Sequence, residues 1–316
     1  MQTETHSLTQ QATHLSGGVL LDHLGIIKIE GDDAAKFIHG QLTQDFSLLD
    51  TTGARLAALC SPKGRMLASF IGYKDAQGTI FLLCSKDLLA ATLKRLSMFV
   101  MRAKARLSDA SNQHTVYGLA GDAVLTTGAA MGTPWAKADL PNAAVAITLH
   151  PAAGAARQLW IGAANAAPPA VTALSKELWH WSEVQSGVAT LSAPLADQFV
   201  PQMLNFESVG GVSFKKGCYP GQEVVARSQF RGTIKRRAFI VHCEACMQPA
   251  DTIYAEADPT QECGLVLQCA PAPQGGFDAL ISAQVLAIKG GQLHLSAPDG
   301  PKLSVLTLAY DLIEDI

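Results

Sequence analysis

One cysteine of this chain stands among residues that could give it chemistry. Cys218 directly follows Lys-Lys-Gly at 215–217. A neighbouring ammonium group favours thiolate over thiol, so Lys216 would lower the pKa of this thiol. Gly217 frees the backbone before the cysteine, and Pro220-Gly221 is a natural central pair of a type II turn. These residue types predict a functional thiol on a tight loop and not a small buried hydrophobic residue.

The residue types leave the role of this thiol open. Cys218 could act as a nucleophile, as a redox-active thiol or as a transient ligand of a metal or cluster. One thiol is too few to hold an iron–sulfur cluster, which normally needs four ligands, so any ligation would be shared with a partner. We expect Lys216 and Arg227 to lower the thiol pKa, and Gln222 and Glu223 to stiffen the loop or orient a substrate.

Positive charge is concentrated around the same cysteine. Between residues 213 and 237 seven cations face one acid, Glu223, in a chain whose formal net charge is −3. The cations are Lys215, Lys216, Arg227, Arg231, Lys235, Arg236 and Arg237. One or two of them could simply protect a solvated strand edge. The whole group favours an anionic partner.

Metal and nucleotide sites are not expected. Cys243 and Cys246 have a zinc-like spacing, but Cys263 and Cys269 would lie roughly 20 Å apart along one unbroken strand, too far to share an ion. The nine histidines never pair at a metal-ligand spacing. The sequence also lacks a Walker loop and a strand followed by Gly-x-Gly-x-x-Gly.

The composition is that of a soluble globular protein. The 316 residues are 48% hydrophobic and 16% charged, enough for two or three domains and unlike a disordered chain. No apolar run is long enough to span a membrane, and residues 1–16 read as a frayed polar tail without the apolar core of a secretory signal. Seven irregularly spaced cysteines do not form a disulfide framework, so a cytoplasmic location is expected.

The periodicity predicts an α+β fold that is not a doubly wound sheet. Short turn sequences should pair consecutive early strands antiparallel, and a helix after Ser85 should bury one leucine face. A later helix should start at the Ala-Ala-Pro-Pro run, with Trp181 on its apolar side and Trp179 free to face a pocket. From 234 onward strands follow without a helix signal, which is typical of a small barrel. The predicted strands are 25–30, 55–60, 65–73, 79–84, 98–107, 115–120, 143–149, 157–162, 237–243, 263–269, 277–288, 292–296 and 303–309.

The cysteine segment also carries a family resemblance. Lys-Gly-Cys-Tyr-Pro-Gly-Gln-Glu at 216–223 resembles the signature of the YgfZ-type folate-binding proteins, relatives of the glycine-cleavage aminomethyltransferase, or T-protein. Its motif positions beside the cysteine are Gly217, Tyr219, Gly221 and Gln222. The likeness extends upstream through 199–205 and 210–216, and downstream through 225–227, 230–232 and 235–236.

The resemblance implies a three-domain T-protein-like architecture around a central pocket. The first domain would be discontinuous and consist of residues 18–110 and 188–233. Residues 111–187 would form the second domain, and residues 234–316 a C-terminal β-barrel. It further implies binding of tetrahydrofolate or a derivative, and support of iron–sulfur enzymes and of the tRNA modifications that depend on them. Folate, iron–sulfur proteins and tRNA-modifying enzymes are the partners it suggests.

Individual site residues follow from the same resemblance. Trp179 matches a folate-contacting tryptophan, Gln185 stands where the family often has a pterin-reading glutamate, and Leu24 stands at a second tryptophan position. Asn205 and Arg227 are further expected folate contacts. Arg231, Lys235 and Arg236 are expected to bind an anion, either a folate glutamate tail or an RNA backbone.

The resemblance also argues against one activity and leaves others open. Aminomethyl transfer in the T-protein uses an aspartate on the early strands, and residues 63–70 here contain no acid. Glycine cleavage is therefore not expected. A folate-dependent one-carbon transferase with Cys218 as nucleophile stays open, as does an RNA-binding adaptor that uses the basic run. A sequence pI near 6.3 gives no support for a broad RNA surface.

Overall fold

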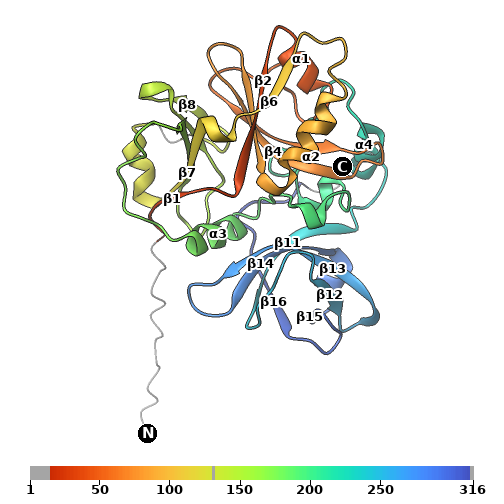
Figure 1. The fold of residues 1–316 in the computed structure, drawn as a ribbon. Coiled ribbons are helices and arrows are strands. Elements are labelled where there is room, and N and C mark those ends of the chain that lie inside the picture. Colours follow the sequence, from red (N-terminus) through yellow and green to blue (C-terminus); the bar gives the residue numbers. More distant parts are fainter. Residues whose placement is uncertain (1–14, 130–131, 314–316) are drawn as a thin grey trace.

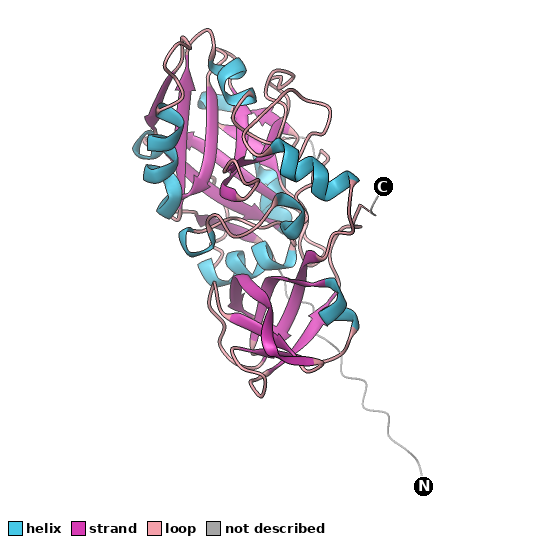
Figure 2. Ribbon diagram, turned by 90° about the vertical axis from the view of Figure 1, so that its right-hand side faces the viewer, coloured by secondary structure: helices cyan, strands magenta, loops and turns pink. Residues whose placement is uncertain are grey.

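Three antiparallel sheets make up the protein (Figure 1). The computed structural model describes residues 15–129 and 132–313, so nearly all of the predicted N-terminal tail lies outside the described residues. Two of the sheets are open and five-stranded, and the third closes into a six-stranded barrel. Helix α3 (Lys176–Gln185) contacts both the N-terminal strand β1 (Gly17–Leu20) and two barrel strands, and so joins the upper sheets to the barrel below (Figures 1 and 2).

The first sheet has the order β3-β4-β5-β2-β6. Its strands are β2 (Leu24–Glu30), β3 (Ala54–Cys60), β4 (Met66–Lys74), β5 (Ile80–Ser85) and β6 (Arg106–Asp109), with helices α1 (Ala34–His39) and α2 (Lys86–Ser97). The early strand predictions and their antiparallel pairing are confirmed. The strand predicted at 98–107 is wrong over most of its length. Backbone bonds from Met98 to Arg95 and from Phe99 to Leu96 instead continue helix α2 into turns.

The second sheet has the order β1-β7-β10-β9-β8. Beside β1 it contains β7 (His114–Ala120), β8 (Lys137–Asp139), β9 (Val145–Thr148) and β10 (Arg157–Ala163), linked partly by the short 3-10 segments η1 (Ser111–Gln113), η2 (Gly121–Thr127) and η3 (Pro141–Ala143). Helix α3 starts later than predicted, at Lys176 and not at the prolines. The hydroxyl of Ser175 accepts a hydrogen bond from the Leu178 N–H and so caps the helix there.

The barrel is closed in the order β11-β14-β13-β12-β15-β16. The strands are β11 (Arg236–Cys243), β12 (Thr252–Ala255), β13 (Asp258–Pro271), β14 (Phe277–Gln284), β15 (Leu293–Leu295) and β16 (Lys302–Leu306). The predicted C-terminal barrel is confirmed, but the prediction that no helix intervenes is wrong. Because the pairing of β14 with β11 ends at Gln284, the chain leaves the ladder there and forms helix α5 (Val285–Lys289).

The segment that follows α3 returns to the first sheet. It carries η4 (Ala193–Leu195), η5 (Pro201–Leu204) and helix α4 (Gln222–Phe230). Asp197 N–H donates to the Met66 carbonyl at 2.7 Å, and Met66 N–H donates to the Phe199 carbonyl at 2.8 Å. One hydrophobic core contains side chains of the first sheet, the return segment and three barrel strands. The residue boundaries of the three domains stay a prediction.

Two bulk expectations can be compared with the structure. In the described ranges no helix is long and apolar enough to cross a membrane. All seven cysteines lie in those ranges and are free.

Candidate functional site

The cysteine loop is a type II turn that docks on the β3–β4 hairpin. Gly221 has φ 80° and ψ 3°, and the Gln222 N–H donates to the Tyr219 carbonyl at 3.2 Å, as the sequence predicts. A Cβ at Gly221 would lie 2.4 Å from the Ser61 carbonyl oxygen and 2.6 Å from the Gly64 Cα. Both the dihedral angles and the close approach therefore require glycine. Cys218, which directly precedes the first turn residue Tyr219, is exposed to solvent.

Lys216 is anchored beneath this loop. The residue is only 7% exposed, and its ammonium group donates to the carbonyls of His39 at 2.6 Å and Gly217 at 3.1 Å. It also lies 4.6 Å from the centroid of the Tyr219 ring. Burial lowers the pKa of Lys216 to about 8, against an opposing effect of Asp45 and of a Cys218 thiolate. Lys216 therefore fixes the loop to α1 as well as placing a charge near the thiol.

Arg227 and Glu223 pair with each other on the solvent face of α4. Their side chains are 62% and 85% exposed and meet at 2.8 Å, four residues apart. The Arg227 guanidinium therefore shares its charge with a carboxylate. Its predicted effects on the thiol and on folate are not evident from these contacts.

The cations near the start of the barrel differ in their exposure to solvent. Arg237 is buried and forms an ion pair with the buried Glu207, and it also donates to the Ile313 carbonyl at 2.8 Å. Its charge is used inside the protein. Arg231 and Lys235 are exposed and Arg236 is half-buried, so these three remain able to meet an anion.

The expected folate contacts do not gather in one cavity. Trp179 is 0% exposed, its ring would clash with any Cβ at Gly118, and the Arg157 guanidinium lies 4.5 Å from its ring centroid. The interpretation that Trp179 is free to face a pocket is therefore corrected. Leu24 borders a small interior cavity of about 50 Å³.

Asn205 has a structural task at this position. Its side-chain N–H donates to the Ala238 carbonyl at 2.9 Å, and its carbonyl oxygen accepts from the Ala238 N–H at 3.1 Å. The residue has φ 57°, a left-handed conformation that asparagine tolerates. The amide thus ties the return segment to β11 and has little capacity left for a ligand.

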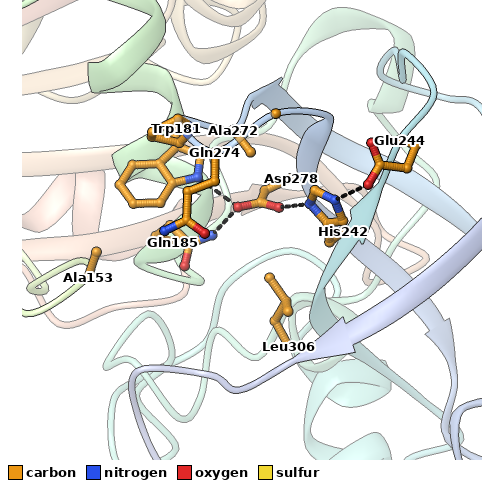
Figure 3. Close-up of a pocket in the computed structure, with 11 residues that line it drawn as sticks. Ala153, Trp181, Gln185, His242, Glu244, Ala272, Gln274, Asp278 and Leu306 are labelled. Atoms are coloured by element: carbon orange, nitrogen blue, oxygen red, sulfur yellow. Dashed lines mark hydrogen bonds and ion pairs between the residues drawn. The ribbon is translucent and has the colours of Figure 1, made fainter. Parts of the chain in front are cut away.

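Gln185 lines a cavity of about 500 Å³ between α3, the barrel and residue Ala153 (Figure 3). Its amide N–H donates to Asp278 Oδ2 at 2.8 Å, and the Trp181 indole N–H donates to the same oxygen at 2.7 Å. The other carboxylate oxygen, Oδ1, meets His242 Nδ1 at 2.8 Å. Figure 3 shows these side chains converging on Asp278, with Glu244 beyond the imidazole at 3.5 Å.

This arrangement creates a polar wall able to recognise a heterocycle. The hydrogen bond that His242 donates to Asp278 raises the pKa of His242, and this effect is larger than the lowering by partial burial. Gln185 spends one amide N–H on Asp278, which leaves a second N–H and a carbonyl oxygen for a ligand. Sequence reasoning missed His242 and Asp278. The available signal was an acid near the start of a strand, residues 277–284, that carries no other charged residue.

Among the described cavities that border an expected folate contact, volume favours the cavity of Gln185 over that of Leu24. Ligand sites for molecules of drug size occupy about 300–1,000 Å³. The interior cavities beside Leu24 and Arg157 are about 50 and 40 Å³, too small for a pterin, whereas the cavity of Gln185 is large enough. The size of the Gln185 cavity and its mixture of hydrogen-bond donors and acceptors both fit a folate.

Comparison with known proteins identifies the family. The tRNA-modifying protein YgfZ of Hamiltonella defensa subsp. Acyrthosiphon pisum (strain 5AT) is 30% identical over 241 residues, 73% of this chain and 71% of that protein. The chain belongs to the YgfZ family. A protein of Haemophilus influenzae described as uncharacterized is also 30% identical to this family member, over 227 residues, 72% of the chain and 73% of that protein. No family model matches the chain.

A solved structure shows the fold of this YgfZ family member. The glycine cleavage system aminomethyltransferase T from Bartonella henselae superposes with a TM-score of 0.68 over 95% of this chain and 87% of that one. The identity is 14%, so the likeness concerns the fold alone. The predicted α+β, T-protein-like architecture is confirmed.

Proposed function

We propose that this protein binds a tetrahydrofolate-class ligand in the cavity of Gln185 and supports tRNA modification, including the modifications that depend on iron–sulfur enzymes. The observation that carries the proposal is the cavity of about 500 Å³ at which Gln185, Trp181 and His242 converge on Asp278. Membership of the YgfZ family, and the relative named a tRNA-modifying protein, support the cellular role.

The cavity side chains suggest how a pterin is recognised. A pterin presents amide and amino N–H groups beside a carbonyl and a ring nitrogen, so it needs acceptors and donors in one plane. Gln185 offers both kinds of group, and Asp278 holds the amide in place. A protonated His242 adds an N–H donor. When bound, the folate would supply a carrier for one-carbon groups, and these residues would orient it and exclude water.

Cys218 has a separate role in this proposal. Its thiol is exposed on a rigid turn and does not line the cavity of Gln185. An exposed thiol whose neighbours are cationic suits contact with a second protein more than contact with a buried ligand. We therefore assign Cys218 to the encounter with an iron–sulfur protein, where its thiolate would supply one ligand to the cluster.

The cellular role is tested by measuring tRNA nucleosides. In a strain that lacks this gene, mass spectrometry should show loss of nucleosides made by iron–sulfur enzymes, and the intact gene should restore them. Cys218→Ser and Gln185→Met should restore them poorly, whereas Cys246→Ser, which changes another exposed thiol, should restore them fully. Full restoration by both site variants would contradict the proposal.

Two in vitro assays separate the alternative functions. A one-carbon transferase would consume methylene-tetrahydrofolate at a measurable rate, while an accessory protein binds it without turnover. An RNA adaptor would bind tRNA with strong salt dependence and without any influence of folate. Either outcome would replace the proposed function.

A further inference from the structure

Three potential metal ligands from two distant parts of the chain meet on one side of α3. His180 and Glu183 are three residues apart on the helix, so they project from neighbouring turns. His23 comes from the turn between β1 and β2. One ligand atom from each of the three side chains lies within 4.8 Å of the other two.

Their mutual geometry suits a shared ion. Glu183 Oε2 lies 2.8 Å from His180 Nδ1, and Glu183 Oε1 lies 3.7 Å from His23 Nε2. The two imidazole rings meet edge to face, with centroids 4.8 Å apart at 62°. Two ligands bound tetrahedrally at about 2.1 Å to one ion lie roughly 3.4 Å apart, so modest side-chain rotations separate this arrangement from coordination.

The group borders a cavity that an ion and its waters can enter. This cavity of about 270 Å³ is also lined by Ser85, Ser192 and Gln268, whose oxygens can hold coordinated water. The side chains of His23 and His180 are 33% and 40% exposed, and that of Glu183 is 17% exposed. The carboxylate of Glu183 is thus the most buried of the three groups, and the two imidazoles are more exposed to solvent.

We propose that His23, His180 and Glu183 bind a first-row divalent transition-metal ion of the Zn²⁺ or Fe²⁺ type. Two imidazoles and one carboxylate are a common set for such ions and leave coordination positions open. Mg²⁺ and Ca²⁺ prefer oxygen ligands and are disfavoured by the two nitrogens. The open positions face the cavity, where they can take water or a small oxygen ligand.

This inference goes beyond the proposed function and departs from the expectation that the chain holds no metal site. The histidine count missed it because His23 and His180 are far apart in sequence and the third ligand is a glutamate. The site is also separate from the cavity of Gln185, which lies where α3 meets β14.

Calorimetric titration of the full-length, chelator-treated protein with Zn²⁺ tests the site. We expect one ion per chain. His180→Ala and Glu183→Gln should each weaken binding at least about tenfold, the loss seen even for partners of metal ligands. His23→Ala changes an exposed turn and gives a second test should a helix variant fold poorly, with circular dichroism as the check.

Two controls exclude other zinc-binding groups. Cys218→Ser, Cys246→Ser and Cys269→Ser remove the two exposed thiols and the thiol that lines this cavity, and His114→Ala removes a histidine outside the group; all four should bind Zn²⁺ like the unchanged protein. Co²⁺ should give visible bands without a sulfur charge-transfer band. Absence of binding, binding that survives His180→Ala and Glu183→Gln, or binding lost in a thiol variant would overturn the assignment and leave a hydrogen-bonded cluster only.

Discussion

His242 and Asp278 are paired across two barrel strands, and their side chains meet at 2.8 Å between Nδ1 and Oδ1. The second oxygen of the same carboxylate accepts from Trp181 and Gln185 on α3. One buried carboxylate thus connects β11, β14 and the helix that lies between the barrel and the upper sheets. The wall of the proposed folate cavity and the junction of these elements are the same group of side chains.

Replacing Asp278 with alanine should destabilise the protein. The change removes the acceptor of the buried Trp181 N–H and of the Gln185 amide, and a buried donor left without a partner costs about 1–3 kcal/mol. Urea unfolding should show this loss. Glu262→Ala, at an exposed acid of β13, should change stability by no more than about 0.5 kcal/mol. Equal effects of the two substitutions would contradict the role of Asp278.

The pair also predicts a pH dependence. Because the pKa of His242 is raised in the folded state, protonation of this imidazole stabilises the fold. That contribution is complete below the unfolded pKa of about 6.5 and is lost as pH rises through the folded pKa. The difference in unfolding free energy between the unchanged protein and His242→Gln should therefore shrink from pH 5.5 toward pH 8.5. A difference that grows over this range would show the opposite coupling.

The two arginine pairs should differ sharply in their effect on stability. Glu207→Ala leaves the buried Arg237 guanidinium without its carboxylate, and such losses cost about 3–5 kcal/mol. Arg227→Ala breaks an exposed pair and should cost less than about 1 kcal/mol. Denaturant unfolding of both variants checks the contrast, and a mild effect of Glu207→Ala would show that the buried pair contributes little.

Gly221→Ala should disturb the loop that carries Cys218. The left-handed conformation costs a residue with a Cβ about 1–3 kcal/mol, and the Ser61 carbonyl adds a direct clash. We expect lower stability and an altered rate of Cys218 alkylation. Gly232→Ala is the matched control, since a Cβ there meets no atom within 4 Å. If Gly221→Ala behaves like Gly232→Ala, the turn does not position the thiol.

Local signals in the sequence predicted local structure well. Short turns such as residues 62–64 fixed antiparallel neighbours, and Pro220-Gly221 gave the type II turn with its observed hydrogen bond. The resemblance in the cysteine segment led to the family and the fold. The predicted strand at 277–288 failed at its end, because local sequence did not show where pairing stops. The pairing of β14 with β11 ends at Gln284, and helix α5 forms there instead.

The side-chain clusters could not be read from the sequence. Gln185 and Asp278 are 93 residues apart, and only the docking of α3 on the barrel brings them together. The apolar stripe of the helix likewise did not show which of the two tryptophans, Trp179 or Trp181, faces the cavity. Trp179 is sealed by the second sheet and Arg157, while Trp181 reaches the cavity, because both faces of α3 are covered by other elements.

A calorimetric titration with tetrahydrofolate most directly tests the central claim, that a folate binds in the cavity of Gln185. The account predicts one ligand per chain, weakened about 5- to 30-fold by Gln185→Met or Trp181→Phe, which corresponds to one or two kcal/mol of lost hydrogen bonding. Gln77→Met, at an exposed glutamine in a turn, should bind like the unchanged protein. No binding, or binding indifferent to Gln185→Met and Trp181→Phe, would contradict the placement of a folate beside Asp278.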